Sequence, residues 1–414
     1  MNKVLLLFAK GFPYNISEPF LENEYPLYSD YFDQIIIVTG CKRGEQPSRR
    51  ISDPAINVLS DFTLSKDKKA IIEALPYVLT DSMFYQELWK LIKGKQLSPR
   101  RMYQLCVMSL CGNHRALMAK RWIQSRNLAS DVEVAYSYWL DIPAYAAIRF
   151  RQLIGKTGIR VVSRCHGYDV YSERKPGNYM PFQEQILRQV NSIASVSKAG
   201  MDYLQEKYAL HDRIFTWYLG SADKGVTNPY SSRETFRIVS CARVVPLKRL
   251  TRIVDGLRLL RGQKIMWTHI GGGEGLEELK EYATRNLPEE VQVEWRGTIP
   301  NEEVYAIYGS EPFHAFISVS STEGLPVSMC EAFSFQIPII ATAVGGVPEI
   351  VEDGICGKLL LPDFSDEEFV TAIEWMAGLP ETDYLKMREA ARAKFESTFD
   401  AQKNNREFIE SYLT

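Results

Sequence analysis

The sequence predicts an α/β protein with two doubly wound domains that face each other across a central cleft. In both halves of the chain, short apolar runs alternate with longer stretches of helical apolar spacing. A polar segment rich in Gly, Pro and Ser, residues 220–234, separates the halves and lacks apolar periodicity. We therefore expect a first domain over 1–219, a linker over 220–236, a second domain over 237–400 and a C-terminal helix over 401–414.

The composition fits a globular protein with two hydrophobic cores. Of the 414 residues, 45% are hydrophobic and 24% are charged, and the formal net charge is only −2. Such a small net charge gives no reason to expect a nucleic-acid partner. The seven cysteines are scattered and never form a Cys-x-x-Cys pair, which predicts reduced thiols, with neither a zinc site nor a disulfide framework.

No stretch of the sequence predicts a membrane span. The apolar run near the N-terminus, Val4 to Ala9, is too short for a signal peptide, and no later run reaches about 18 apolar residues. We expect a cytoplasmic protein that is soluble or bound only to a membrane surface.

The first domain opens with a predicted strand, helix and strand. Lys3 to Ala9 and Gln34 to Thr39 are apolar runs, and residues 19–30 between them suit a helix. Gly11 follows the first run and would let the backbone approach a ligand closely, although an ordinary turn glycine is the alternative. The loop is not a P-loop, because no Gly-Lys-Ser/Thr follows it.

The segment from Leu88 to Ser130 has an unusual charge pattern. It contains no Asp or Glu, and Trp89, Tyr103 and Trp122 are interleaved with its cations. Two interpretations stay open: a basic amphipathic face that rests on anionic lipid, and a solvated helical hairpin over the core. No nucleic-acid-binding motif accompanies the charge. The cations are Lys90, Lys93, Lys95, Arg100, Arg101, Arg115, Lys120, Arg121 and Arg126.

A polar loop follows one of the later strands of the first domain. His166 and Asp169 lie in Arg-Cys-His-Gly-Tyr-Asp, directly after the predicted strand Arg160 to Ser163. Ligands of open parallel sheets bind beyond the carboxyl ends of the strands, which favours a functional role, whereas a histidine satisfied in the core is the alternative. Ser197 is expected to cap a helix after the third strand. The strands are predicted at Val132 to Tyr136, Arg160 to Ser163 and Ser192 to Val196.

Two cations follow the first strand of the second domain, Arg237 to Cys241. Arg243 and Lys248 lie five residues apart before a helix, a placement that suits a diphosphate, with solvated surface charge as the alternative. The next strand, Ile265 to Ile270, leads into Gly-Gly-Gly-Glu-Gly, whose spacing is not that of a dinucleotide fingerprint. We therefore do not expect an oxidoreductase.

The stretch from His314 to Glu352 predicts a strand, a loop, a helix and a second strand. Glu323 lies in the loop, and Glu331 lies in the helix among apolar neighbours, where a carboxylate needs hydrogen bonds. Two sugar hydroxyls would supply them, because a carboxylate can accept from both. A helix-start acid at Glu323 and a core ion pair at Glu331 are the alternatives. The amides just before the helix would meet an anion.

Together these residues resemble a known donor-site signature. Ser-x-x-Glu-Gly-Leu-Pro ends at Pro326, a second Glu follows eight positions after the first, and Pro-Ile-Ile-Ala-Thr and Gly-Gly-x-Pro-Glu-Ile come next. The pattern resembles that of retaining glycosyltransferases of the GT-B type, in the family of glycosyl transferases group 1 (family 4 type). The resemblance implies an acceptor-binding and a nucleotide-sugar-binding Rossmann-like domain, with the C-terminal helix crossing back to the first.

The resemblance also implies a reaction of the hexosyltransferase type. A sugar would move from a nucleotide-diphosphate donor, a UDP-sugar, to a hydroxyl of a glycan or lipid-linked acceptor with retained configuration, in cell-surface polysaccharide biosynthesis. No metal or other cofactor is expected, since the chain lacks an Asp-x-Asp triplet. The implied catalytic residues are His166, Asp169, Arg243, Lys248 and Glu323. The implied donor-binding residues are Gly11, Arg243, Lys248, Thr298, Ile299, Glu323, Gly324, Leu325, Pro326 and Glu331.

The resemblance gives the residues of the second domain distinct roles. Glu331 would hold the nucleotide ribose and Glu323 the donor sugar. Arg243 and Lys248 would hold the diphosphate. Family members often have Gly where this chain has Arg249, so the geometry of that loop is open.

In the first domain, the resemblance gives His166 a contact with the donor sugar and Asp169 a role in orienting that sugar or the acceptor. Gly11 would lie between donor phosphate and acceptor. Thr298 and Ile299, in the second domain, lie where the family seats the base. A nucleotide-sugar epimerase, a binding module without catalysis and a membrane scaffold are the rival interpretations.

Overall fold

The computed structural model divides the chain into two compact domains. The first comprises Met1–Trp217 together with Asn405–Thr414, and the second comprises Tyr218–Asn404. The structure describes residues 3–14, 18, 20–41, 45–62 and 68–414.

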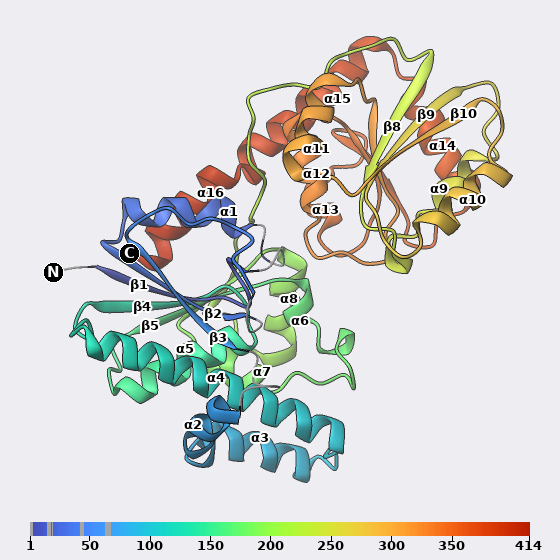
Figure 1. Ribbon diagram of the computed structural model, residues 1–414. Helices are drawn as coiled ribbons and strands as arrows, with labels where there is room; N and C mark the ends of the chain where they lie inside the picture. Colours follow the sequence, from blue (N-terminus) through green and yellow to red (C-terminus); the bar gives the residue numbers. More distant parts are fainter. Residues whose placement is uncertain (1–2, 15–17, 19, 42–44, 63–67) are drawn as a thin grey trace. The chain divides into compact units, whose positions relative to one another are not determined.

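The core of the first domain is a seven-stranded parallel sheet in the order β3-β2-β1-β4-β5-β6-β7 (Figure 1). The chain order reverses where β1 pairs with β4, so the loops after these two strands meet at the switch point, where open α/β sheets bind ligands. The strands are β1 (Val4–Phe8), β2 (Gln34–Cys41), β3 (Ile56–Phe62), β4 (Val132–Ser137), β5 (Arg160–Cys165), β6 (Ser192–Ser195) and β7 (Ile214–Thr216).

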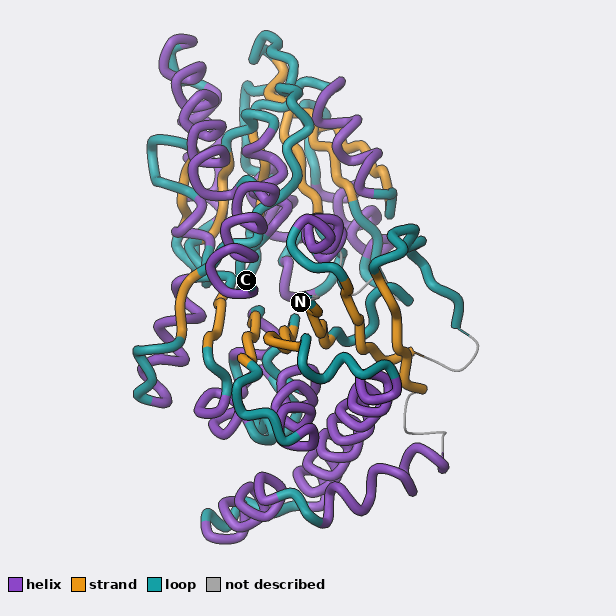
Figure 2. Tube along the Cα trace, turned by 90° about the vertical axis from the view of Figure 1, so that its left-hand side faces the viewer, coloured by secondary structure: helices purple, strands orange, loops and turns teal. Residues whose placement is uncertain are grey.

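Helices cover both faces of this sheet (Figures 1 and 2), which is why β1 is buried along its whole length and reads as a continuous apolar run. Ser197 caps α8 as expected, because its hydroxyl accepts from the Gly200 amide at 3.1 Å. The helices are α1 (Leu21–Glu24), η1 (Tyr25–Asp30), α2 (Lys68–Leu79), α3 (Ser82–Lys93), α4 (Pro99–Ser125), α5 (Ile142–Ile154), α6 (Gly167–Val170), η2 (Ser172–Arg174), α7 (Gln183–Gln189) and α8 (Lys198–Tyr208).

The helix expected over residues 19–30 is shorter than predicted. Only Leu21–Glu24 is α-helical, and a 3-10 helix continues from Tyr25 to Asp30. Pro26 lies at the start of that second piece and has no N–H to continue an α-helical ladder. Residue 19 itself lies outside the described residues.

The last residues of the chain pack on the first domain. Phe408, Ile409 and Leu413 join the apolar cluster on one face of its sheet. Arg160 fixes the terminus, because its guanidinium donates to the carbonyl of Thr414 at 2.9 Å. The helical stretch consists of α16 (Ala401–Phe408) and a π-helical turn, η5 (Ile409–Leu413).

The second domain contains a six-stranded parallel sheet in the order β10-β9-β8-β11-β12-β13. Its first strand begins at Thr235, two residues before the expected start at Arg237 and inside the expected linker. The order reverses between β8 and β11, which makes the loops after these strands the second switch point. The strands are β8 (Thr235–Cys241), β9 (Lys264–Ile270), β10 (Val291–Gly297), β11 (Ala315–Ser318), β12 (Ile339–Thr342) and β13 (Gly357–Leu360).

Helices also flank this second sheet on both sides (Figure 1), so the expectation of two doubly wound parallel α/β domains is confirmed. The helices are η3 (Pro246–Lys248), α9 (Thr251–Leu257), α10 (Leu276–Asn286), α11 (Asn301–Ser310), α12 (Val327–Ser334), α13 (Val347–Ile350), α14 (Asp366–Ala377), α15 (Glu381–Lys394) and η4 (Phe395–Phe399).

The basic segment 88–130 forms the end of α3 and the long helix α4. Several of its cations form hydrogen bonds or ion pairs within the first domain. Arg115 is buried, and it and Lys120 donate to backbone carbonyls at 3.1 and 2.8 Å. Lys90 pairs with Glu184 at 2.9 Å. The nine cations therefore do not share one solvent-facing surface, as a single amphipathic face would require.

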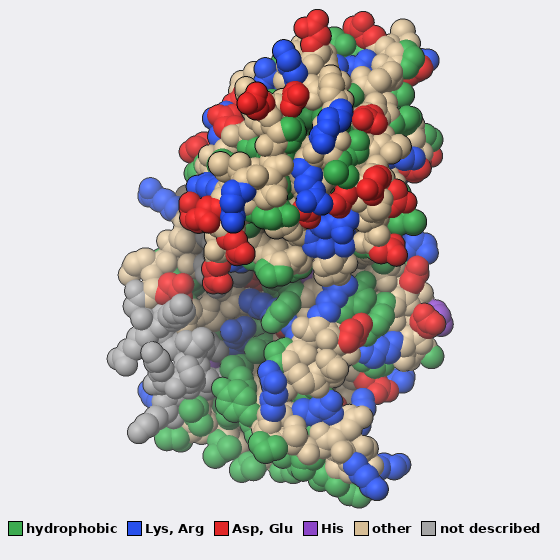
Figure 3. Space-filling model, turned by 90° about the vertical axis from the view of Figure 1, so that its right-hand side faces the viewer, with side chains coloured by type: hydrophobic (Ala, Val, Ile, Leu, Met, Phe, Trp, Pro, Cys, Tyr) green, Lys and Arg blue, Asp and Glu red, His purple; other side chains and the backbone are tan. Residues whose placement is uncertain are grey.

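What remains exposed is the tip of the α3–α4 hairpin, residues 89–103. Trp89 and Tyr103 are 66% and 68% exposed, and Ile92 and Leu97 accompany them. Besides Lys90, which pairs with Glu184, the cations at this hairpin tip that lie open to solvent are Lys93, Lys95 and Arg100. In Figure 3 the lower edge of the first domain accordingly shows hydrophobic and basic side chains and little acid. No helix in the described part of the chain is long and apolar enough to cross a membrane.

Candidate active site

The carboxyl edge of the second sheet gathers the predicted residues of that domain. Arg243 and Lys248 follow β8, Thr298 and Ile299 follow β10, and the stretch from Glu323 to Pro326 follows β11. Parallel strands end at the same edge, so loops far apart in the sequence meet there.

Lys248 and Glu323 form the central ion pair of this edge. The Lys248 ammonium lies 2.5 Å from a Glu323 carboxylate oxygen, and both side chains are mostly buried. Ser321 holds the two loops together, because its amide donates to the Leu247 carbonyl at 2.8 Å. The charges of the two predicted site residues therefore neutralise each other.

The conformation of Arg249 answers the question that the sequence left open about the loop after β8. Its backbone has φ = 48°, the left-handed conformation that favours glycine. The guanidinium compensates by donating to the carbonyls of Val319 (2.7 Å), Ser320 (3.1 Å) and Pro362 (2.8 Å). The turn thus keeps a shape that glycine could adopt, and the arginine ties it to the end of β11.

Glu331 is a buried carboxylate with neutral partners. It lies in α12 and accepts hydrogen bonds from the Asn301 amide and the Tyr305 hydroxyl, both at 3.2 Å. Burial raises its pKa to about 7, and these two hydrogen bonds oppose the rise. Among the described residues no Arg or Lys pairs with Glu331, which removes the core-ion-pair alternative.

Cys241 shows that Glu331 and Lys248 surround the same strand end. Burial and then the Glu331 charge raise the pKa of the Cys241 thiol to about 12, against the opposing effects of a hydrogen bond with Tyr308 and of the Lys248 charge. A carboxylate and an ammonium therefore act on one buried thiol at the end of β8.

Two glycine runs shape the backbone of this edge. A Cβ at Gly345, where φ is +53°, would overlap the Glu323 carbonyl oxygen, and the Gly346 amide donates to the Gly324 carbonyl at 2.8 Å. In the run after β9, a Cβ at Gly273 would lie 2.6 Å from the Val244 carbonyl oxygen. At both runs the backbone of one loop packs directly against the backbone of another, and a side chain would not fit there. This packing explains why glycine occupies these positions, so a dinucleotide-binding role is not needed to explain them.

Several hydrogen-bond donors at this edge face no protein partner. Arg243 is exposed and pairs with none of the residues that the structure describes. The amides of Gly324 and Leu325, just before α12, likewise donate to no described acceptor. A guanidinium and two free amides before a helix suit an anionic ligand.

In the first domain, His166 lies after β5 between two aromatic rings. The imidazole centroid lies 4.4 Å from that of Trp139 and 5.0 Å from that of Tyr138. Burial, followed by the charges of Arg164 and Lys10, lowers the pKa of His166 well below its usual value, so the ring is neutral. Neither ring nitrogen has a hydrogen-bond partner among the described residues. Both nitrogens are buried polar atoms whose hydrogen-bonding capacity is unused within the described residues.

Asp169 uses its carboxylate on the backbone. Its oxygens accept from the His166 amide at 2.5 Å and from the Leu140 amide at 2.7 Å. Burial raises its pKa to about 7, although the Lys10 charge lowers it. Asp169 therefore orients the His166 loop. Both of its carboxylate oxygens already accept hydrogen bonds from backbone amides.

The Gly11 loop closes around an acid of its own chain. The amides of Lys10, Gly11 and Phe12 donate to the buried Glu18 carboxylate at 2.9, 2.8 and 2.7 Å. The Trp139 indole N–H donates to the same carboxylate at 2.8 Å. Glu18 thus fixes both the loop after β1 and the tryptophan whose ring packs against His166 at a tilt of 40°.

Sequence reasoning missed four residues of this cluster: Lys10, Glu18, Trp139 and Asp141. The Lys10 ammonium pairs with Asp141 at 2.8 Å and lies 3.8 Å from the centroid of the Trp139 ring. The available signal was position, because Lys10 follows β1 and Asp141 follows β4, the two strands of the switch point. No spacing rule identifies Glu18.

The predicted residues thus form two groups, one in each domain. Gly11, His166 and Asp169 lie at the carboxyl edge of the first sheet. The rest lie at the carboxyl edge of the second sheet: Arg243, Lys248, Thr298, Ile299, Glu323, Gly324, Leu325, Pro326 and Glu331.

Residues 229–394 match the family of glycosyl transferases group 1. The chain is 27% identical over 323 residues to the putative colanic acid biosynthesis glycosyltransferase WcaL of Escherichia coli K12, covering 72% of this chain and 79% of that protein. It is 29% identical over 173 residues to the amylovoran biosynthesis glycosyltransferase AmsK of Erwinia amylovora, covering 40% and 42%.

Two solved structures resemble this chain, and each match covers 99% of this chain and 99% of the other protein. One is the lipopolysaccharide outer core galactosyltransferase WaaB in its apo form, with a TM-score of 0.69 and 15% identity. The other is HepE of Anabaena in complex with UDP, with a TM-score of 0.67 and 14% identity. Together with the two parallel α/β domains, these likenesses give the chain the GT-B fold.

Proposed function

We propose that this chain, a glycosyltransferase of the GT-B fold, moves a sugar from a nucleotide-diphosphate donor to a hydroxyl of a glycan or lipid-linked acceptor and retains the anomeric configuration. One observation carries the proposal. A buried carboxylate with neutral partners, Glu331, and the Lys248–Glu323 ion pair lie at the same strand edge, beside unpartnered donors. Relatives named for colanic acid and amylovoran biosynthesis support a place in cell-surface polysaccharide biosynthesis.

In the proposed donor complex, Glu331 exchanges its amide and phenol partners for two ribose hydroxyls. Lys248 turns from Glu323 to the diphosphate, and Glu323 then accepts from the donor sugar. Thr298 and Ile299 seat the base, for which the UDP and UDP-glucose complexes of HepE favour uracil. No cofactor beyond the donor takes part.

In the transfer itself, the bond between the anomeric carbon and the diphosphate oxygen breaks while the acceptor oxygen bonds to that carbon and gives its proton to the departing diphosphate oxygen. Negative charge develops on the leaving diphosphate. Arg243, Lys248 and the amides of Gly324 and Leu325 stabilise that charge. His166 contacts the donor sugar through its neutral ring, and Asp169 holds the histidine loop.

The function is tested by binding and product analysis. A panel of nucleotide-diphosphate sugars is screened by thermal shift, since a bound ligand raises the melting temperature by mass action. Stabilising donors are then incubated with and without oligosaccharide acceptors, and NMR assigns the anomeric configuration of the product. Conversion of the donor without any acceptor would favour an epimerase. Absence of stabilisation at millimolar concentration by every donor would refute the proposal.

Glu18 and Trp139 offer a test of the role of His166. Replacing Glu18 with Gln turns an amide group toward backbone donors that need an acceptor, so the loop and the indole should shift and kcat should fall about tenfold. Trp139→Phe keeps a ring on His166 and loses only the N–H, so its kcat should fall less than that of Trp139→Ala. Steady-state kinetics with the identified donor measures both.

A purely structural role for Glu18 would give a different pattern. The melting temperature would then drop in Glu18→Gln while kcat per folded molecule stayed normal. Equal kcat values for Trp139→Phe and Trp139→Ala would likewise speak against a stacking role.

We also propose a peripheral contact between the hairpin tip and the inner membrane surface. Its aromatic and aliphatic side chains lie beside the exposed cations Lys93, Lys95 and Arg100. Each such cation is worth roughly 1 kcal/mol at an anionic surface, and salt screens that attraction. Co-sedimentation with vesicles that contain anionic lipid should therefore fall with salt, and more than tenfold in Lys93→Glu/Lys95→Glu/Arg100→Glu.

The matched control for the vesicle experiment changes three exposed cations of the second domain. Lys264, Arg285 and Lys403 lie on the exposed surface outside α3 and α4, and their change to Glu should leave vesicle binding unaltered. Binding that ignores lipid charge, or that falls equally in the control, would exclude the hairpin tip as the contact.

A further inference from the structure

The first domain contains a pocket that the proposed chemistry does not use. Its volume is about 290 Å³, and it lies between α4, the start of α5 and the chain from α6 to residue 181. β4 and β5 end beside it, so it opens at the carboxyl edge of the sheet, next to the His166 loop. It is lined by Tyr103, Gln104, Val107, Met108, Asp141, Ile142, Tyr168, Lys175, Pro176, Tyr179, Met180 and Pro181.

The lining favours a hydrocarbon over a sugar ring. Most of it is apolar, with Val107, Met108 and Ile142 on the helical side. The Gln104 amide nitrogen donates to a backbone carbonyl at 3.1 Å, and one Asp141 oxygen pairs with a lysine at 2.8 Å. The other oxygen of each side chain has no described partner but is buried, so it offers no accessible surface to a ligand in the pocket. A sugar would need several free hydroxyl partners, whereas a hydrocarbon chain needs none.

One cation on the wall has no carboxylate partner. The Lys175 ammonium lies 3.0 Å from the centroid of the Tyr168 ring and forms no ion pair with any described residue. The Lys175 side chain is half-buried, and this burial lowers its pKa to about 8. A phosphate beside the pocket would pair with this ammonium and hold it charged.

The mouth of the pocket continues into the hairpin tip. Tyr103 lines the pocket and is also among the most exposed aromatic residues of the chain. The exposed side chains of Ile92 and Leu97 belong to the same tip. A lipid chain could therefore enter the pocket from the surface proposed to meet the membrane.

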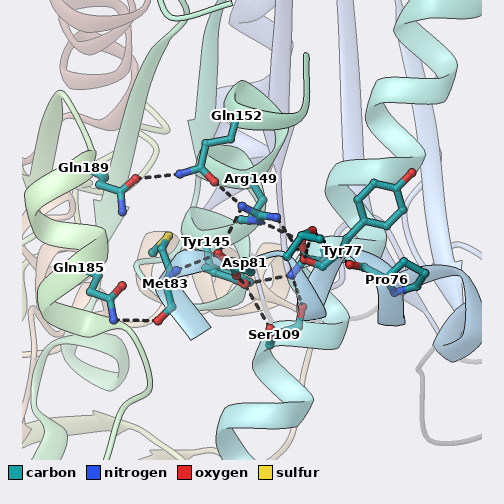
Figure 4. Close-up of polar contacts among 12 residues, drawn as sticks. Pro76, Tyr77, Asp81, Met83, Ser109, Tyr145, Arg149, Gln152, Gln185 and Gln189 are labelled. Atoms are coloured by element: carbon teal, nitrogen blue, oxygen red, sulfur yellow. Dashed lines mark hydrogen bonds and ion pairs between the residues drawn. The ribbon is translucent and has the colours of Figure 1, made fainter. Parts of the chain in front are cut away.

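A buried polar network connects α4 and α5, two of the elements that line the pocket (Figure 4). The Tyr145 hydroxyl on α5 donates to Asp81 and accepts from Asn113 on α4 at 3.0 Å. Arg149 on α5 pairs with Asp81 at 3.2 Å and donates to Asn113 at 2.8 Å. These contacts bind α4 to α5, so the two helices that form the wall cannot easily collapse into the pocket.

We propose that this pocket binds the first part of the hydrocarbon chain of a lipid phosphate or diphosphate that carries the acceptor sugar, with Lys175 at the phosphate. This inference rests on the proposed function, because the lipid would carry the acceptor sugar of that reaction. It also makes a claim about binding that can be tested without any transfer.

The probe is farnesyl diphosphate, used below its aggregation limit and titrated into the full-length protein by calorimetry. Farnesol and inorganic diphosphate are titrated separately, which distinguishes the lipid from its head group. Farnesyl diphosphate should bind at least tenfold more tightly than either. Val107→Trp, which fills the pocket, should weaken farnesyl diphosphate and farnesol at least tenfold. Lys175→Met should weaken farnesyl diphosphate and leave farnesol unchanged, because farnesol carries no phosphate.

The control variant is Val226→Trp, on the exposed surface of the second domain, which should bind all three probes as the unchanged protein does. Melting curves establish that each variant is folded. Equal binding of farnesyl diphosphate to Val107→Trp and the unchanged protein, or binding no tighter than that of inorganic diphosphate, would overturn the pocket assignment. Nucleotide-sugar binding, measured in parallel, tests the proposed function separately, so one can fail while the other stands.

Discussion

Replacing Glu331 with glutamine is expected to reduce nucleotide binding more than a hundredfold and, at the same time, to raise the melting temperature at neutral pH. The amide can accept one hydroxyl through its oxygen, but it turns an N–H₂ group toward the second, so bidentate recognition is lost. Calorimetric titration with UDP and thermal melting of the same sample measure the two effects.

The gain in stability follows from the raised pKa of Glu331. The ordinary value of 4.5 applies to the unfolded chain, whereas the folded value is about 7. Between these values the folded protein holds a proton that the unfolded chain releases, so this group's contribution to stability falls as pH rises from about 4.5 to 7. Glutamine stays neutral, and the glutamine variant should not lose this contribution, which is of the order of 3 kcal/mol.

The pH dependence separates this explanation from a general effect of mutation. The difference in melting temperature between the variant and the unchanged protein should grow from pH 4.5 to about 7 and then level off. UDP affinity of the unchanged protein should rise over the same range, because the ionised carboxylate is the better acceptor. Glu303→Gln, on the exposed face of α11, is the control and should alter neither quantity. Parallel melting curves at every pH would contradict the assigned pKa.

The alternation of apolar runs was sufficient to predict two parallel sheets, because strands covered on both faces are mostly apolar along their length. β1 and β12 are buried at every position, and β1 begins and ends within one residue of the predicted run from Lys3 to Ala9. The helix over 19–30 was overestimated because apolar spacing does not register the missing N–H of Pro26.

The second-domain site was accessible from sequence because its residues lie within short motifs. Glu323 and Glu331 flank one helix start, so their common edge follows from local structure. The first-domain cluster is different, since Glu18 meets Trp139 across 121 positions and only the folded sheet brings them together. Arg115 illustrates the same limit, because a cation counted as surface charge proved to be buried against the loop after β1.

Changing Gly345 to alanine is expected to lower kcat/KM more than a hundredfold. Two effects add at this position. The backbone is left-handed, which costs alanine about 1–2 kcal/mol, and the new Cβ would overlap the Glu323 carbonyl oxygen. The backbone of the Glu323 loop must therefore move, and a displacement of about 1 Å in a reacting group costs roughly a hundredfold in rate. Steady-state kinetics with the identified donor measures the loss.

Gly354 supplies a matched control for this prediction. Its φ of +78° is also left-handed, but a Cβ there would meet no atom within 4 Å. Gly354→Ala should therefore lose a similar 1–2 kcal/mol of stability while keeping kcat/KM within about twofold. The difference between the two variants isolates the contact between the glycine turn and the Glu323 loop. If both variants lost activity equally, backbone strain alone would explain the result, and the loop would not depend on that contact for its position.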